Sequence, residues 1–225
     1  VESVKKQTYK NIEIIIINDG STQPEYYTHD FQDTIIPVKI IHLKTNSKLK
    51  FGYPCQAYVR TVCCIESNPK TKYIAFLDDD DIWFPDKLLL QIKAMKRTGS
   101  SLSCTEGLIG TGIYQDKTIY KRYINDHSHD RVKKIFINAG SNYLDHDIYP
   151  EIWGLDFIKI HNCIVASSVV IKKKILQHID FFKFMSGLGE DYHCWLKALE
   201  LTNCVFVNQV CFYYDDDHGD GRNWS

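Results

Sequence analysis

Four consecutive carboxylates, Asp78 to Asp81, follow directly after the apolar run Tyr73–Leu77. Two like charges about 4 Å apart repel each other by roughly 4 kcal/mol at an effective dielectric of about 20. Such a cluster must hold a proton, spread into water or bind a cation. Carboxylate oxygens without Cys or His beside them favour Mg²⁺ or Mn²⁺, ions that usually share their coordination sphere with phosphates. We therefore favour a metal–phosphate site over the alternative, a solvated acidic turn. Alternation along a strand would place Asp78 and Asp80 on one side, where both could reach one ion.

The elements on either side must position this cluster. Tyr73–Leu77 is a short run bounded by charge, which predicts a strand buried on both faces of a parallel sheet. A helix is predicted to begin at Pro85, whose missing N–H costs nothing in a first turn, and to end near Gly99. Ligands collect at the carboxyl ends of strands in open α/β sheets, which supports a binding site here.

A second carboxylate follows another predicted strand. Ile12–Asn18 is a buried β run, and the turn Asp19-Gly-Ser-Thr22 comes directly after it. A carboxylate at a strand end can accept hydrogen bonds from a ligand bound there. The alternative is that Asp19 closes an Asx turn between the strand and the next helix.

A third acidic group lies near the carboxyl end of the chain. Glu190 and Asp191 follow two glycines and precede a helical pattern in which Tyr192, Trp195 and Leu199 share one face. Two glycines followed by two adjacent acids suit a mobile loop that presents a carboxylate. The alternative is routine capping of a helix amino terminus.

These segments together resemble the family 2 glycosyltransferases of the GT-A fold. The segment FLDDDDIWFPDKL is similar to the DxD motif of that family, QTYKNIEIIIINDGST to its opening, and GEDYHCWLKAL to its acidic helix start. The resemblance covers essentially the whole chain. It implies an α/β, Rossmann-like fold with a mixed, mainly parallel central sheet between helices. It also implies one domain over residues 1–225, with a nucleotide-sugar half at about 1–98 and an acceptor half at about 99–225.

The resemblance assigns roles to individual residues. Asp19 would bind the base, Asp78, Asp79 and Arg60 the donor, and Asp80 with Asp78 and His218 a divalent metal. Asp191 would be the catalytic base, with Glu190 as its substitute. Arg60 could instead be an ordinary charge on a helix surface. Three aspartates before His218 depart from the family pattern, which leaves open whether His218 is a ligand or an exposed side chain.

The implied reaction moves a sugar, with inversion, from a nucleotide-sugar to an acceptor hydroxyl on a glycan, protein or lipid, with Mn²⁺ or Mg²⁺ as cofactor. A UDP-sugar is the favoured donor, and the activity is that of a hexosyltransferase. An aspartate near its ordinary pKa of about 3.9 is a poor base, so we expect burial or repulsion from Glu190 to raise the pKa of Asp191. Two alternatives remain: a Mg²⁺-dependent nucleotidyltransferase, and a non-catalytic domain that binds nucleotide-sugars or glycans.

Composition sets the wider limits. There are 27 basic and 28 acidic residues, so no overall field attracts nucleic acid. No apolar run approaches the 18 or so residues that span a bilayer, and we expect no membrane segment in this chain. Eight scattered cysteines without a CxxC pair predict reduced thiols. We therefore expect a reducing, cytoplasmic location, where the chain could be part of a longer or membrane-associated protein.

Other regions give weaker expectations. The family pattern begins with one further strand, so we expect that strand to be missing from the sequence that starts at Val1. Residues 204–207 and 210–214 predict a terminal hairpin. The aromatic side chains of residues 138–160 are either a platform for an acceptor sugar or packing of a loop against the core; they are Tyr143, Tyr149, Trp153 and Phe157.

Overall fold

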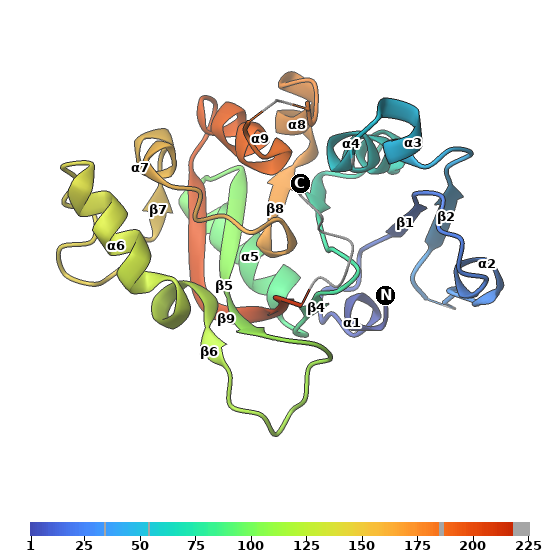
Figure 1. Ribbon diagram of the computed structural model, residues 1–225, viewed down its shortest axis with the longest axis horizontal. Coiled ribbons are helices and arrows are strands. Elements are labelled where there is room, and N and C mark those ends of the chain that lie inside the picture. Colours follow the sequence, from blue (N-terminus) through green and yellow to red (C-terminus); the bar gives the residue numbers. More distant parts are fainter. Residues whose placement is uncertain (34, 54, 185–186, 218–225) are drawn as a thin grey trace.

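The computed structural model describes residues 1–33, 35–53, 55–184 and 187–217. The chain alternates short helices and strands (Figure 1). The elements are α1 (Glu2–Lys5), β1 (Ile14–Asn18), α2 (Glu25–Thr28), β2 (Val38–His42), α3 (Ser47–Phe51), α4 (Gln56–Glu66), β3 (Tyr73–Ala75), β4 (Ile82–Trp83), α5 (Lys87–Thr98), β5 (Leu102–Gly110), β6 (Lys121–Arg122), the π-helix η1 (Tyr123–His127), α6 (His129–Asn138), β7 (Ile152–Trp153), α7 (Leu155–Ile160), the 3₁₀ helix η2 (Ala166–Ser168), β8 (Val170–Lys172), α8 (Lys173–His178), α9 (Glu190–Leu199) and β9 (Cys204–Asp215).

A seven-stranded sheet forms the centre, with the order β3-β8-β5-β9-β4; β6 pairs with β5, and β7 with β9. The α/β class and the mixed character of the sheet are confirmed. The expectation of a mainly parallel sheet is wrong for this sheet, because within the described residues only β5 and β9 run parallel in it. The reason is that β8, β4, β6 and β7 are short strands that meet their neighbours antiparallel.

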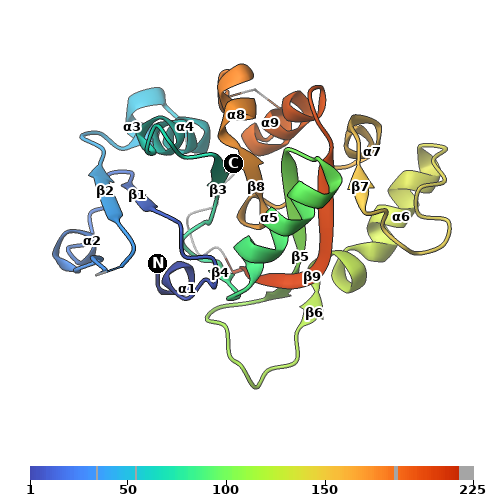
Figure 2. The same ribbon diagram turned by 180° about the vertical axis from the view of Figure 1, so that it is seen from behind.

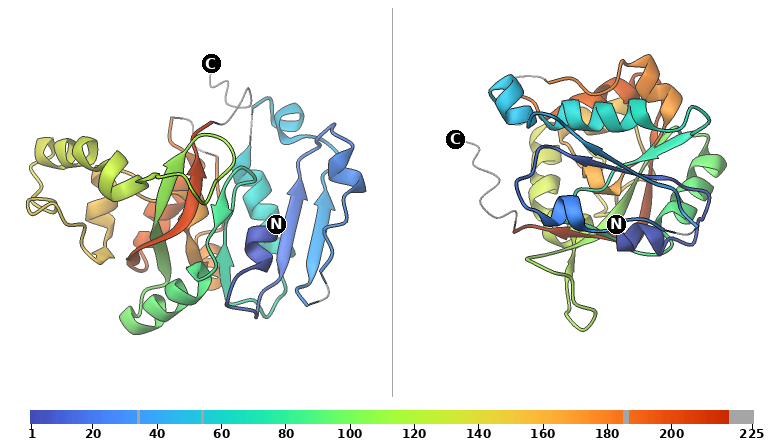
Figure 3. Two further views of the ribbon diagram at one scale, coloured as in Figure 1. Left: turned by 90° about the horizontal axis from the view of Figure 1, so that it is seen from below. Right: turned by 90° about the vertical axis from the view of Figure 1, so that its right-hand side faces the viewer.

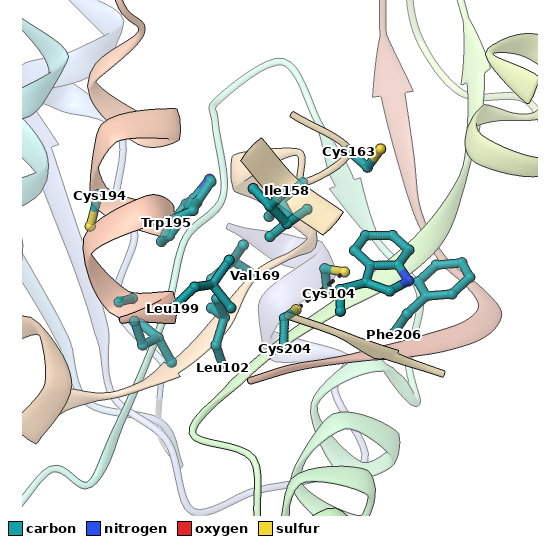
Figure 4. Close-up of a cluster of buried hydrophobic side chains, with 14 of the residues drawn as sticks. Leu102, Cys104, Ile158, Cys163, Val169, Cys194, Trp195, Leu199, Cys204 and Phe206 are labelled. Carbon is teal, nitrogen blue, oxygen red and sulfur yellow. Dashed lines mark hydrogen bonds between the residues drawn. The ribbon is translucent and has the colours of Figure 1, made fainter. Parts of the chain in front are cut away.

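Alternate residues of the central strands face two different layers of helices. Val170 and Val205 pack with the apolar side of α5 on one face, which Figure 2 shows in front of β5 and β9. Ile171 and Cys204 point to the other face, where Trp195 of α9 lies in the larger core cluster, part of which Figure 4 shows. This period of two is what a sheet covered on both sides requires.

β1 and β2 form a separate, parallel two-stranded sheet. The pair lies at the end of the molecule opposite α6 (Figure 3). In the described part of the chain neither strand pairs with the seven-stranded sheet. The expectation of a further strand before Val1 stays a prediction.

The end of the chain differs from the expected hairpin. Residues 204–215 form the single strand β9, which runs parallel to β5 with register shifts at Glu106. Gly107 makes this pairing possible, because a Cβ atom there would lie within 2.8 Å of three carbons of the Phe212 ring. The polar residues Asn208 and Gln209, which look like a turn in sequence, sit where the register shifts.

The described residues include no helix both long and apolar enough to cross a bilayer. All eight cysteines are free thiols, as expected, and seven of them are buried. The Sγ atoms of Cys104 and Cys204 lie 3.6 Å apart in the core.

Candidate active site

The four aspartates form a turn rather than the end of a strand. β3 already ends at Ala75, and the N–H of Asp81 donates to the carbonyl of Asp78 at 3.3 Å. The prediction that strand alternation sets the direction of these side chains is therefore wrong. The helix that follows begins at Lys87, two residues later than predicted, with Asp86 as its N-cap.

Two distant segments hold this turn in place. The N–H of Asp78 donates to the Oγ of Ser167 at 3.0 Å, and the indole N–H of Trp83 donates to the carbonyl of Ser167 at 2.7 Å. The Oδ1 of Asp81 accepts from the N–H of Asp215 in β9 at 3.0 Å. Neither Ser167 nor Asp215 was predicted as a site residue, and the only sequence signal for Ser167 is a pair of serines within an apolar run.

Burial and mutual repulsion perturb two of these carboxyls. Burial, and then the charge of Asp80, raises the pKa of Asp79. Asp81 is 6% exposed, and burial raises its pKa to about 7, although the Ser167 hydroxyl and the Asp215 N–H offset part of this effect. The turn therefore gathers acidic groups in a site where their charges are costly.

Arg60 in α4 joins this turn to the acidic pair of α9. Its Nη2 lies 2.9 Å from the Oδ1 and 3.2 Å from the Oδ2 of Asp78, while its Nη1 lies 2.5 Å from the Oε1 of Glu190. The side chain of Arg60 is only 12% exposed. It is therefore not an ordinary surface charge. Its role toward a donor phosphate stays a prediction.

α9 presents Glu190 and Asp191 in its first turn, where the helix dipole favours acids. The helix is anchored by Trp195, which is fully buried, and by the Tyr192 hydroxyl, which donates to the carbonyl of Ile158 at 2.9 Å. Burial, and then the charge of Glu190, raises the pKa of Asp191. This direction confirms the expectation, and it moves Asp191 toward the proton affinity that a general base needs.

Asp19 already has partners within the protein. Its Oδ1 accepts from the N–H of Ser47 at 2.7 Å and its Oδ2 from the Ser47 hydroxyl at 2.6 Å, at the start of α3. The local turn is closed instead by Asn18, whose side chain accepts from the N–H of Ser21. Each carboxylate oxygen of Asp19 keeps a second lone pair, so base binding stays a prediction.

The aromatic candidates for an acceptor platform differ in their exposure. Trp153, Tyr149 and Phe157 are at most 5% exposed and pack in the core, whereas Tyr143 is 45% exposed, so most of the aromatic segment is loop packing. His218 lies outside the described residues. A cavity of about 470 Å³ between α5 and β9 is lined in part by Tyr149, but by none of the described candidates for donor, metal or base roles.

The donor set of the turn fits a hard divalent cation. It offers only carboxylate oxygens, and the repulsion between Asp79 and Asp80 is the kind that a cation relieves. No group of three His, Cys, Asp or Glu side chains stands ready to hold a metal within residues 1–33, 35–53, 55–184 and 187–217. Ligand oxygens from a phosphate or water would have to complete such a site.

Comparison with known proteins points to the same family as the sequence motifs. The family model for glycosyl transferase family 2 matches residues 1–52 and 66–176. The chain is 41% identical over 207 residues to the Escherichia coli UDP-Glc:alpha-D-GlcNAc-diphosphoundecaprenol beta-1,3-glucosyltransferase WfaP, covering 88% of this chain and 63% of that protein. It is 26% identical over 217 residues to an uncharacterized Rickettsia typhi glycosyltransferase, covering 93% of this chain and 56% of the relative.

A solved structure shares the fold. The crystal structure of S. aureus TarS 1-349 in complex with UDP-GlcNAc matches with a TM-score of 0.63 and 16% identity, covering 97% of this chain and 54% of that one. A complex of the same protein with UDP matches with a TM-score of 0.62. The chain thus spans little more than half the length of these proteins. On the family match and the identity to its relatives, the chain belongs to glycosyl transferase family 2.

Proposed function

We propose that this chain transfers a hexosyl group, with inversion, from a UDP-sugar to a hydroxyl of a lipid-linked sugar diphosphate. The observation that carries the proposal is the contact of Arg60 with both Asp78 and Glu190. This contact brings the acidic turn that suits a donor diphosphate next to the acidic pair that suits a base. Transfer between a donor and an acceptor needs both groups in one site.

The donor side of the site would consist of the acidic turn, Arg60 and Asp19. The UDP and UDP-GlcNAc complexes of TarS support a uridine nucleotide as donor. Asp80 and Asp78 would hold a divalent cation, which when bound would neutralise negative charge on the leaving diphosphate. Arg60 already holds the carboxylate of Asp78 by a hydrogen bond. Its guanidinium would also place a positive charge near a phosphate oxygen of the donor.

The acceptor side would be served by Asp191. Its raised pKa lets its carboxylate take the proton of an acceptor hydroxyl as that oxygen attacks the anomeric carbon opposite UDP. Glu190, held by Arg60, adds negative charge that keeps the pKa of Asp191 high. The name of WfaP supports glucose as the sugar and a GlcNAc diphosphate lipid as the acceptor.

The test measures UDP release by the purified chain. A panel of UDP- and GDP-sugars is supplied with a short-chain GlcNAc diphosphate lipid analogue, in Mn²⁺, in Mg²⁺ and in chelator. We expect metal-dependent UDP release and an acceptor-linked product with one UDP-sugar, and loss of both in Asp191→Asn. The anomeric configuration of the product, read by NMR, tests inversion. Product with retained configuration would refute the single-displacement mechanism.

The alternatives give different outcomes in the same assay. A nucleotidyltransferase would release pyrophosphate from a nucleoside triphosphate and no UDP from a sugar donor. A binding domain would bind a UDP-sugar in calorimetry, and the native chain would show no turnover of it with any acceptor. Either result would overturn the proposed activity.

A further inference from the structure

The loop between β5 and β6, residues 111–120, projects from the body of the molecule (Figure 1). Two aliphatic side chains on it are almost fully in solvent: Ile113 is 87% exposed and Ile119 is 99% exposed. Each is followed directly by a tyrosine. We name Ile113, Ile119 and the two tyrosines, Tyr114 and Tyr120, the apolar tip.

The tip is an ordered structure. The rings of Tyr114 and Tyr120 stack with their centroids 5.5 Å apart, and both contact the ring of Tyr213 in β9. The N–H of Gln115 donates to the Tyr120 hydroxyl at 3.0 Å. The tyrosines therefore tie the loop to the core of the protein, while the isoleucines gain no burial from this arrangement.

The charges beside the apolar tip favour an anionic surface. Over the loop and the adjoining strand β6, residues 111–122, three basic residues, Lys117, Lys121 and Arg122, stand against one acidic residue, Asp116. Arg122 also pairs with Asp126 at 3.0 Å, so the two lysines and Asp116 leave an excess of one positive charge in this segment. Exposed aliphatics, tyrosines and lysines on one projecting element are the composition of segments that lie in a membrane interface.

The base of the loop is bonded to the candidate active site. The N–H of Gly112 donates to the Oδ1 of Asp215 at 2.7 Å, and the N–H of Asp215 donates to Asp81 at 3.0 Å. The Phe84 ring, just after the acidic turn, packs edge-on against Tyr114. A surface that held the apolar tip would therefore lie next to the acidic turn.

We propose that the apolar tip inserts into the interface of an anionic phospholipid bilayer and holds the active site beside it. The docking itself rests on the loop, whereas its use, delivery of a lipid-borne acceptor, rests on the function proposed above. A protein partner or a second copy of this chain would suit isoleucines equally well. The excess of lysines favours the lipid surface, and the experiment separates these occupants.

The experiment measures co-sedimentation of the chain with vesicles of phosphatidylglycerol and phosphatidylcholine. We expect binding that rises with phosphatidylglycerol content and falls with salt. The double variant Ile113→Ser/Ile119→Ser should lower the partition coefficient at least about tenfold, from the lost transfer of two aliphatic side chains. The matched control, Ile35→Ser/Ile148→Ser, alters isoleucines that are 78% and 70% exposed elsewhere and should leave binding unchanged. Lys117→Glu/Lys121→Glu should weaken binding to the anionic vesicles alone.

Three results would overturn the docking proposal: no vesicle binding by the native chain, equal binding by the two isoleucine variants, or self-association in ultracentrifugation that the tip variant abolishes. None of these depends on turnover, so docking and activity can fail separately. If both proposals hold, the tip variant keeps its rate on a short, water-soluble acceptor analogue. It then loses rate only on an acceptor embedded in vesicles.

Discussion

Replacing Asp81 by asparagine should change how the stability of the fold depends on pH. Asp81 is buried, and its pKa lies at about 7 in the folded chain against 3.8 when exposed. Between these two values the folded chain binds a proton that the unfolded chain releases. The free energy of unfolding therefore falls as pH rises through this window. The amide side chain of the Asp81→Asn variant would keep an acceptor for the Asp215 N–H, but it carries no titrating proton.

The size of the effect follows from the shift. About three pKa units correspond to about 4 kcal/mol between fully acidic and fully basic conditions. In the unfolded chain this aspartate titrates mostly below pH 5, so part of the change in the free energy of unfolding falls outside the range of the assay. The change between pH 5 and pH 8 is about 2–3 kcal/mol. Asp81→Asn should be close to the native chain in stability at pH 5 and more stable by about this amount at pH 8.

The assay is urea unfolding followed by tryptophan fluorescence at several pH values, without divalent metal. Histidines and other acids titrate in both proteins, so the difference between the two curves isolates Asp81. Parallel curves for Asp81→Asn and the native chain would show that burial does not hold a proton at Asp81.

Three further changes test the site and the sheet. Arg60→Met should lower the free energy of unfolding by about 3 kcal/mol, because it leaves the largely buried carboxylate of Glu190 unpaired. It should also move the acid limb of the pH–rate profile to higher pH, because Arg60 lowers the pKa of Asp191. An acid limb at the same pH as in the native chain would contradict this. Asp191→Asn should reduce turnover by a factor of about 10²–10⁴ while UDP affinity in calorimetry changes little; equal losses of both would contradict a base. Gly107→Ala should lower the free energy of unfolding by about 1–3 kcal/mol, because its Cβ would overpack against the Phe212 ring. Gly154→Ala is the control: its Cβ would meet only one atom, 3.8 Å away, so its free energy of unfolding should stay nearly unchanged in the same urea assay.

Local patterns in the sequence were sufficient for several elements. β1 matches the predicted run to within two residues, and the C-cap of α5 is Gly99 as predicted, where the backbone has a φ of 76°. These elements depend on periodicity and on a residue that tolerates the left-handed conformation. Both signals are carried by neighbours in sequence.

Pairing between distant segments could not be predicted in the same way. β9 looked like two strands because the polar pair Asn208 and Gln209 interrupts the apolar run, and Asn is a typical turn residue. In the fold, β5 provides a continuous partner, and the shift of register at Glu106 absorbs the polar pair. The acidic turn gives a second example, because Ser167 and Asp215 hold it from 89 and 134 residues away.

The candidate site shows the same difference between local signals and contacts of distant segments. The acidic groups were predicted individually, since each follows a local strand or helix signal. The position of Arg60 between Asp78 and Glu190 was not predicted, because Arg60 and Glu190 are 130 residues apart in sequence. The sequence alone left a donor-binding residue and an ordinary charge on a helix surface as equal alternatives for Arg60. Burial of the guanidinium excludes the surface charge.

The charge balance of the site gives an independent reason to expect metal dependence. Six carboxyl groups lie in the acidic turn and at the start of α9, and Arg60 pairs with two of them. Asp79, Asp81 and Asp191 all have raised pKa values; burial is the largest cause in each case, and a neighbouring carboxylate adds to it. A diphosphate entering such a site brings further negative charge, which the acidic groups oppose. A divalent cation held with the diphosphate would reverse this repulsion, so the chelator arm of the activity assay tests the electrostatics of these residues as well as the family resemblance.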